Sequence, residues 1–284
     1  MPKLAAFVDG SNYTESICDI SAWFALRLDA SINVVHVLGR RDTSSDAPNL
    51  SGSIGLGART TLLEELAELD AHKAKLSMKR GRAILQDAQH YVQSLGVSTV
   101  EVMLRNAEII ETVDEVEHDV DLIVIGKRGL GADFDQMHLG SNLERVVRSS
   151  TKPVLVASRV IKPINRFLIA FDGGNSAWKA IDYAARLKVF ADLHCHLITV
   201  GDGATSNKAG LERAAKTLRD AGYEVTTQVL AGEPETAIAA KVEEDQCDLL
   251  LMGAYGHSRI RNLIIGSTTT QMIRSCKIPV LLFR

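Results

Sequence analysis

Short apolar runs alternate along the chain with longer stretches in which apolar residues recur at helical spacing. Continuous apolar runs are typical of strands that helices cover on both faces of a parallel sheet. In the second half, the pattern predicts strands at 167–171, 193–200, 224–230, 248–252 and 279–283. Between these strands it predicts helices at 175–190, 207–221, 234–245 and 267–275. The alternation indicates a doubly wound α/β fold.

Blocks of the first half recur in the second half in the same order. LAAFVDGSN (4–12) resembles FLIAFDGGN (167–175), and both are apolar runs that reach Asp-Gly. VDLIVIGKRG (120–129) resembles CDLLLMGAYG (247–256), and both are apolar runs followed by Gly-x-x-Gly. These blocks lie at the ends of the first and fourth predicted strands of each half. In such a sheet, those two strands flank the ligand crevice at the carboxyl edge.

A third block, LGSNLERVVRSSTKPVLVA, is matched by IGSTTTQMIRSCKIPVLLF. The distance from Gly140 to Pro153 is 13 residues, and the distance from Gly266 to Pro279 is the same. Three matched blocks in one order predict a tandem duplication. The predicted domains are residues 1–158 and 165–284.

The first half is longer than the second half. Asp9 and Gly126 are 117 positions apart, whereas Asp172 and Gly253 are 81 apart, a difference of 36. The extra residues fit an insertion at about 42–78, between the second strand and the second helix. The charged, amphipathic helix that this region predicts is by default a solvated helix, and covering a groove or a partner is the alternative.

Composition excludes several classes of protein. The 284 residues carry a net charge of −3, which argues against a nucleic-acid binder or a binder of anionic membranes. No apolar run approaches 18 residues, and the first residues lack the pattern of a signal peptide. The four cysteines show no metal-ligand spacing, so we expect reduced thiols in a cytoplasmic protein.

The segment GAYGHSRIRNLIIGSTTT (253–270) carries the candidate chemistry. Glycines allow tight turns and close approach of another molecule, and a helix that starts after Gly266 offers unpaired N–H groups to a phosphate. The arginines at 259 and 261 could neutralise charge. The simpler interpretation is a turn at the glycines with Ser267 as the N-cap. The duplicated pattern at a predicted switch point favours phosphate binding.

The spacing Gly253-x₂-Gly256-x₉-Gly266-Ser267 resembles the nucleotide-loop signature of the universal stress protein family. The FVDGS, HV and KPVLV segments of the first half resemble the family too, and GKRGLGADFDQMHLGSNLERVV is similar to its tandem-domain, UspE-like branch. The resemblance implies two five-stranded, Rossmann-like domains of the adenine nucleotide alpha hydrolase type. They would pack as a pseudo-dimer through their last strands, 153–157 and 279–283.

The resemblance also implies a binding site for ATP, with ADP, AMP and an accompanying Mg²⁺ left open. Asp172 would face the ribose or adenine, and the backbone of Val200 would meet the adenine edge. The phosphates and ribose would contact Gly253, Gly256, Gly266, Ser267 and Thr268. Independently of the resemblance, Arg259 could neutralise phosphate charge and His257 could be a further donor. The matching positions of the first half are Asp9, Val37, Gly126, Gly129, Gly140, Ser141 and Asn142.

The first-half loop departs from this signature. It has ten residues between Gly129 and Gly140, whereas the second-half loop has nine between Gly256 and Gly266, and it contains Asp133 and Asp135. Carboxylates near a triphosphate are unfavourable unless a cation lies between them. We therefore expect the second half to be the better ATP site, although Lys127 and Arg128 could also reach phosphates.

Two further candidate sites carry less weight in the prediction of function. His194 and His196 share one face of a strand, but no third metal ligand is evident, so we expect no metal site. SGSIGLG (51–57) lacks the Lys-Ser/Thr of a P-loop.

Three functions are compatible with these residues. The first is a stress-response regulator that binds adenine nucleotide and hydrolyses it slowly at most, because no general base is evident. The second is a metal-assisted ATP hydrolase or transferase that uses Asp133 and Asp135. The third is a nucleotide-independent scaffold or chaperone-like protein. The protein partner, and whether two chains associate, stay open.

Overall fold

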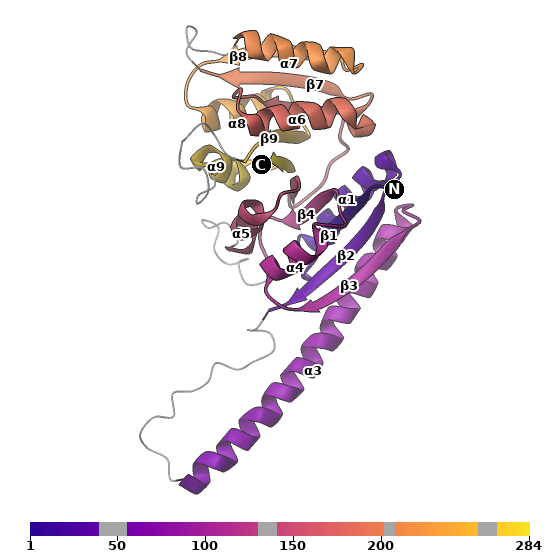
Figure 1. Ribbon diagram of the computed structural model, residues 1–284, viewed down its shortest axis with the longest axis vertical. Helices are drawn as coiled ribbons and strands as arrows, with labels where there is room; N and C mark the ends of the chain where they lie inside the picture. The colour runs from indigo at the N-terminus through magenta and orange to yellow at the C-terminus, as the bar shows by residue number, and fades with distance from the viewer. Residues whose placement is uncertain (40–55, 130–140, 202–207, 255–265) are drawn as a thin grey trace.

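The computed structural model describes residues 1–39, 56–129, 141–201, 208–254 and 266–284. Ten strands within these ranges form one sheet in the order β3-β2-β1-β4-β5-β10-β9-β6-β7-β8 (Figure 1). The strands are β1 (Lys3–Phe7), β2 (Ser31–Leu38), β3 (Val100–Asn106), β4 (Leu122–Gly126), β5 (Val154–Ala157), β6 (Arg166–Ala170), β7 (His194–Val200), β8 (Val225–Leu230), β9 (Leu249–Gly253) and β10 (Val280–Phe283). Five parallel strands in each half make the tandem doubly wound α/β fold that the sequence predicts.

Helices cover both faces of this sheet. They are α1 (Thr14–Leu28), α3 (Leu56–Ser94), α4 (Ile109–Val116), α5 (Ser141–Ser149), α6 (Asn175–Arg186), α7 (Lys208–Asp220), α8 (Pro234–Glu244) and α9 (Ser267–Ser275). The predicted helix 175–190 is wrong at its end, because Leu187 is extended and a 3₁₀ turn, η2 (Lys188–Phe190), follows α6. That break brings Phe190 into a fully buried position.

The apolar runs are continuous because alternate side chains enter two different core layers. In β1, Leu4 and Ala6 lie in one layer, while Ala5 and Phe7 lie in the other. The first layer contains residues of α1, α3, α6 and α7, and the second contains residues of α4, α5, α8 and α9. Each layer includes residues of both halves, so the two halves share their cores.

The halves join where β5 pairs with β10. Their pairing is antiparallel and places Leu155 opposite Leu281, with both side chains fully buried. This confirms the prediction that the last strands of the two halves meet. An edge strand leaves backbone N–H and C=O groups without partners, and here each half satisfies the edge of the other.

Aromatic residues reinforce this junction on one face of the sheet. The ring of Phe190 stacks on Phe167 with centroids 4.9 Å apart and meets the edge of Phe24, from α1 of the first half, at 6.0 Å. Trp23 lies 6.5 Å from Phe190, and the Arg27 guanidinium lies 5.0 Å from the Trp23 ring. Arg27 also donates a hydrogen bond to the Ala191 carbonyl at 3.1 Å, so α1 contacts η2 through both apolar and polar groups.

Two cations cross the junction in opposite directions on the other face. The Lys127 ammonium, from the first half, donates to the carbonyl of Cys276, the C-cap residue of α9. Arg284, from the second half, donates to the carbonyls of Arg148 and Ser149 at 2.7 and 3.2 Å, at the end of α5. Cations stabilise the carbonyl-rich ends of helices, so each half caps the last helix of the other.

Most of the length difference between the halves lies in α3. This helix has 39 residues, whereas α7, its counterpart, has 13. The amino-terminal part of α3 extends well beyond the sheet (Figure 1). The predicted insertion at 42–78 thus includes the start of α3, while residues 40–55 are outside the described ranges. No helix among the residues described is both long and apolar enough to cross a membrane.

We expect Phe190→Ala to lower the free energy of unfolding by about 3–5 kcal/mol, because it empties a fully buried ring site. Since the Phe190 ring contacts both halves, their unfolding should also become less cooperative. Trp23 reports on the first half and Trp178 on the second, so fluorescence in single-tryptophan backgrounds follows each half in urea.

Phe171→Ala is the matched control, because the Phe171 ring contacts Trp178 within the second half. Two coincident fluorescence transitions are expected in that variant. Coincident transitions in Phe190→Ala as well would contradict the coupling role of Phe190.

Candidate functional site

The turn after the first strand of each half is built in the same way. The Asp9 carboxylate accepts the N–H of Ser11 at 3.0 Å, and the Asp172 carboxylate accepts the N–H of Gly174 at 2.8 Å. A side chain that accepts the N–H two residues ahead forms an Asx turn. Both aspartates that the sequence predicts for the site therefore have a local structural task.

The residue after each aspartate must be glycine. Gly10 has φ 76° and Gly173 has φ 81°, a region that other L-residues rarely adopt. At Gly10 a β-carbon would also lie 2.8 Å from Cδ1 of Ile84, so α3 packs directly on this turn. The Asp-Gly pair of the sequence is explained by this backbone geometry in both halves.

The glycine that ends the fourth strand of each half allows a close approach to the start of the helix that follows the first strand. A β-carbon at Gly126 would lie 2.8 Å from the Tyr13 β-carbon, and one at Gly253 would lie 3.0 Å from the Ser176 β-carbon. Tyr13 and Ser176 each stand four residues after the strand-1 aspartate, so this contact is duplicated. Gly126 and Gly253 are therefore required for packing, independently of any ligand.

The second glycine of the first-half loop meets the strand-1 carboxylate. A β-carbon at Gly129 would lie 2.7 Å from Oδ2 of Asp9. The fold thus brings together two predicted site residues that are 120 positions apart. Their second-half counterpart cannot be compared, because Gly256, His257 and Arg259 lie outside the described residues.

The start of α9 is held against the end of β9. Gly266 is the N-cap residue, with φ −55°, and no side chain caps the helix, so Ser267 does not act as the N-cap. The Gly266 N–H donates to the Ala254 carbonyl at 3.3 Å. Ser267 is exposed and Thr268 is half-buried, so both lie at the surface of this helix start.

Thr269 was not predicted from the sequence. It is buried, and its hydroxyl lies 3.2 Å from the carbonyl of Gly253 and 3.2 Å from that of Ala254. One donor at this position joins the first turn of α9 to the end of β9. The run of three threonines was the available signal, but it does not show which hydroxyl turns inward.

The corresponding helix of the first half is α5. Asn142 is exposed in its first turn, while Gly140 and the side chain of Ser141 lie outside the described part of the chain. The predicted adenine-edge residues Val37 and Val200 lie at the ends of β2 and β7, beside the central strands β1 and β6. Both are partly buried against the second core layer.

The side chain of Lys127 contacts the second half of the chain. Its ammonium is buried and donates to the Cys276 carbonyl, so the expectation that it could reach phosphates is wrong. Burial lowers the pKa of Lys127 to about 8, because a charged ammonium loses hydration in the interior. The neighbouring Cys276 thiol is also buried, and burial raises its pKa.

His36 is a second buried polar residue, and its contacts could not be inferred from its position in the sequence. Its Nδ1 lies 2.7 Å from the Val8 carbonyl, at the end of β1. The hydrogen bond connects neighbouring strand ends directly beneath α3. The His-Val pair that resembles the family pattern therefore has a structural task in this chain.

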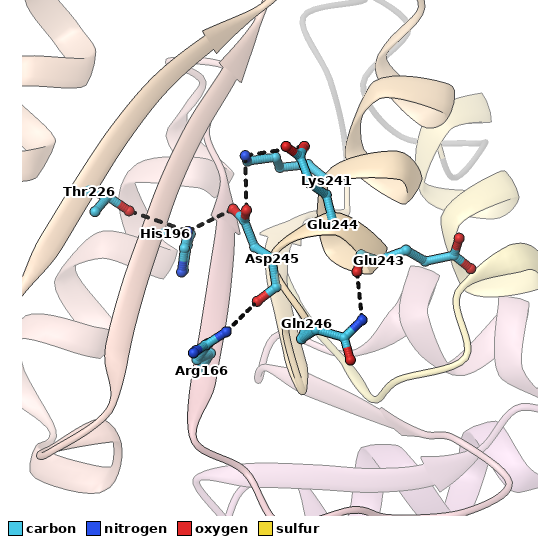
Figure 2. Close-up of polar contacts among 8 residues, drawn as sticks. All are labelled: Arg166, His196, Thr226, Lys241, Glu243, Glu244, Asp245 and Gln246. Atoms are coloured by element: carbon cyan, nitrogen blue, oxygen red, sulfur yellow. Dashed lines mark hydrogen bonds and ion pairs between the residues drawn. The ribbon is translucent and has the colours of Figure 1, made fainter.

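His194 and His196 lie at the start of β7, on the opposite edge of the sheet from Asp172 and Gly253. Nδ1 of His196 is 2.8 Å from the Asp245 carboxylate, and Lys241 approaches the same carboxylate at 2.9 Å (Figure 2). Burial lowers the pKa of His196, and Asp245 acts in the opposite direction. No group of three potential metal ligands occurs among the residues that are described.

The comparisons with known proteins agree with this duplicated architecture. A profile described as the universal stress protein family matches residues 1–158 and 163–284. Over the full length of both proteins, the chain is 39% identical to "Universal stress protein Slr1230" of a Synechocystis strain.

The chain belongs to the universal stress protein family.

Two solved structures share this fold along nearly their whole length. The universal stress protein described here is similar to one from Archaeoglobus fulgidus, with a TM-score of 0.73 and 21% identity over 99% of this chain and 98% of that one. A putative universal stress protein from Pseudomonas aeruginosa gives a TM-score of 0.63 with 13% identity, over 100% and 93% of the two chains. At these identities the likeness concerns the fold alone.

We expect the buried Lys127 to make the stability of this universal stress protein depend on pH. Between its folded pKa of about 8 and its ordinary value of 10.5, the unfolded chain binds more protons than the folded chain. The free energy of unfolding should therefore rise with pH in this window, by about 2 kcal/mol from pH 7 to pH 10 relative to Lys127→Met.

Urea unfolding of wild type and Lys127→Met at matched pH values measures this difference. Lys179→Met is the control, because Lys179 also donates to a carbonyl, that of Arg284 at 2.5 Å, but is exposed. A difference between wild type and Lys127→Met that stays constant with pH would contradict a charged, buried Lys127.

Proposed function

We propose that this protein is a stress-response regulator whose second half binds an adenine nucleotide, ATP in the first place. The observation that carries the proposal is the start of α9. This helix begins at the carboxyl edge of the sheet with no side-chain cap, beside the end of β9. Membership of the universal stress protein family is consistent with a role in the response to stress.

The start of α9 suits a phosphate group. The first N–H groups of a helix have no partner within the helix, and the helix dipole adds partial positive charge there. The exposed Ser267 and the half-buried Thr268 stand in this first turn with hydroxyls that can donate. The Thr269 hydroxyl and the Gly266 N–H hold the turn against β9, so these groups are positioned before a ligand arrives.

The sequence of the two loops favours the second half over the first. Residues 255–265 contain two arginines and no acidic residue, whereas residues 130–140 contain two aspartates and no arginine or lysine. The diversion of Lys127 to the junction also removes a cation from the first-half site. The second-half loop should therefore attract a polyphosphate more strongly than the first-half loop does.

We propose that the protein acts through the binding of the nucleotide, and not through its rapid hydrolysis. The Asp172 carboxylate already accepts the Gly174 N–H, which suits a residue that positions a ligand better than one that removes a proton. The four cysteines are buried free thiols, which fits a reducing compartment such as the cytoplasm, where we propose that the protein acts.

Gly266→Asp tests the site without removing the helix. The Gly266 backbone has φ −55° and ψ 141°, which other residues adopt, and aspartate is a favoured N-cap, so α9 should keep its stability. The new carboxylate would occupy the position proposed for a phosphate. We expect ATP affinity, measured by calorimetry, to fall by about 100-fold or more because a charge-assisted contact is replaced by repulsion.

Gly140→Asp, at the matching position of the first half, is the control and should leave the affinity nearly unchanged. The reverse result would assign the site to the first half. If both variants bind ATP like wild type, or if wild type shows no binding and no rise of Tm with ATP, the proposal is refuted.

A further inference from the structure

The projecting part of α3 begins where the helix leaves the sheet. Gly81 marks this point, because a β-carbon there would lie 2.8 Å from Cδ1 of Leu104 and 2.9 Å from Cδ2 of His36. Towards the carboxyl end, Leu85 and Val92 are buried in the first core layer. Towards the amino end, residues 62–80 extend beyond the rest of the protein (Figure 1).

This projecting segment carries a row of leucines, made of Leu62, Leu66, Leu69 and Leu76. Leu69 is 61% exposed and Leu76 is 64% exposed, whereas Leu62 and Leu66 are partly buried. Leu76 and the buried Leu85 are nine residues apart, which at 3.6 residues per turn places them on opposite sides of the helix, about 180° apart. Leu76, and Leu69 one heptad before it, therefore face away from the protein that the same helix packs against.

The leucines follow a heptad pattern. Leu62, Leu69 and Leu76 are spaced by seven residues, and Leu66 lies between the first two at the alternating position. Rows with this spacing form the seam between two paired helices. A solvated single helix has no need of a leucine at every seventh position.

We propose that residues 62–80 of α3 form an antiparallel helix pair with the same residues of a second copy of this chain. The two chains would be related by a two-fold axis near Ala71. The leucine row would be buried at their interface.

The distribution of charge identifies the partner and its direction. Residues 62–70 contain four acidic residues and no basic residue, whereas residues 71–82 contain five lysines and arginines and no acidic residue. The helix dipole acts only on the first and last turns, and α3 has no acidic residue in its first turn and no basic residue in its last. The segregation is therefore not explained within one helix, but it matches an antiparallel copy, in which acidic and basic segments face each other.

The seam itself also favours the antiparallel direction. With the axis near Ala71, Leu66 meets Leu76 of the second copy, and Lys73 meets Leu69. The aliphatic part of a lysine can cover a leucine while its ammonium reaches water. In a parallel pair with the same seam, Lys73 would instead face Lys73, and two ammonium groups would repel each other.

One charged pair flanks the seam near each of its ends. Glu65 and Lys79 are both exposed and occupy equivalent heptad positions at opposite ends of the segment. In the antiparallel pair, Glu65 of each chain faces Lys79 of the other. The paired segment of 19 residues is about 28 Å long, so we expect a modest affinity, with a Kd on the order of 10 µM.

Sedimentation velocity of the full chain tests the pair, over concentrations from about 1 to 200 µM around that Kd. The wild type should pass from monomer to dimer. Leu76→Glu should raise the Kd by about 100-fold, because it places a carboxylate against Leu66 of the other chain at both ends of the apolar seam. The residue is exposed in the single chain, so circular dichroism should show an unchanged fold.

A charge exchange tests the direction. Glu65→Lys and Lys79→Glu should each raise the Kd by about tenfold, because two attractive pairs become repulsive, and the double variant should return to the wild-type value. Glu68→Lys, Lys75→Glu and their double variant are the controls on the outer side of the helix, and should leave the Kd within about twofold.

A chain that stays monomeric throughout the concentration range would overturn the proposal. A dimer that Leu76→Glu leaves intact would also overturn it, because another surface would then be responsible. If the double exchange fails to restore the affinity lost in the single variants, the antiparallel direction is wrong.

Discussion

The antiparallel pairing of β5 with β10 is the constraint on which the remaining structure depends. It turns two five-stranded sheets into one and relates the halves by an approximate two-fold axis. That relation brings η2 of the second half against α1, and it brings Lys127 and Arg284 to the last helix of the opposite half. Neither half of the chain could keep these contacts alone, because both helix caps and the Trp23 and Phe24 rings beside Phe190 come from the opposite half.

The glycines at the carboxyl edge of the sheet are required by the fold itself. Gly10 and Gly173 have positive φ, and Gly126 and Gly253 allow a strand end to touch a helix start. The start of α9 lies at the same edge, where the Gly266 N–H and the Thr269 hydroxyl hold it against the end of β9. Backbone conformation and packing alone therefore account for glycine at these four positions.

Much of the fold could be predicted because burial on both faces leaves a direct pattern in the sequence. The strand ending at Gly253 and the helix starting at Ser267 lie close to their predicted positions. The direction in which the Lys127 side chain points could not be predicted, since it depends on the carbonyl of Cys276, 149 residues away. Which of three consecutive threonines turns inward at α9, and where α6 breaks before Phe190, depend in the same way on tertiary contacts that no local pattern contains.

The long α3 gives each molecule a single attachment site, because the approximate two-fold axis does not repeat this helix in the second half. A dimer of two identical domains would carry this helix twice, and a helix that pairs with its own kind would then link dimers into open chains. The duplicated chain carries it in one half only, since α7 lacks the extension. Divergence between the halves has therefore left one attachment point on each molecule, and any assembly built through that point closes at two chains.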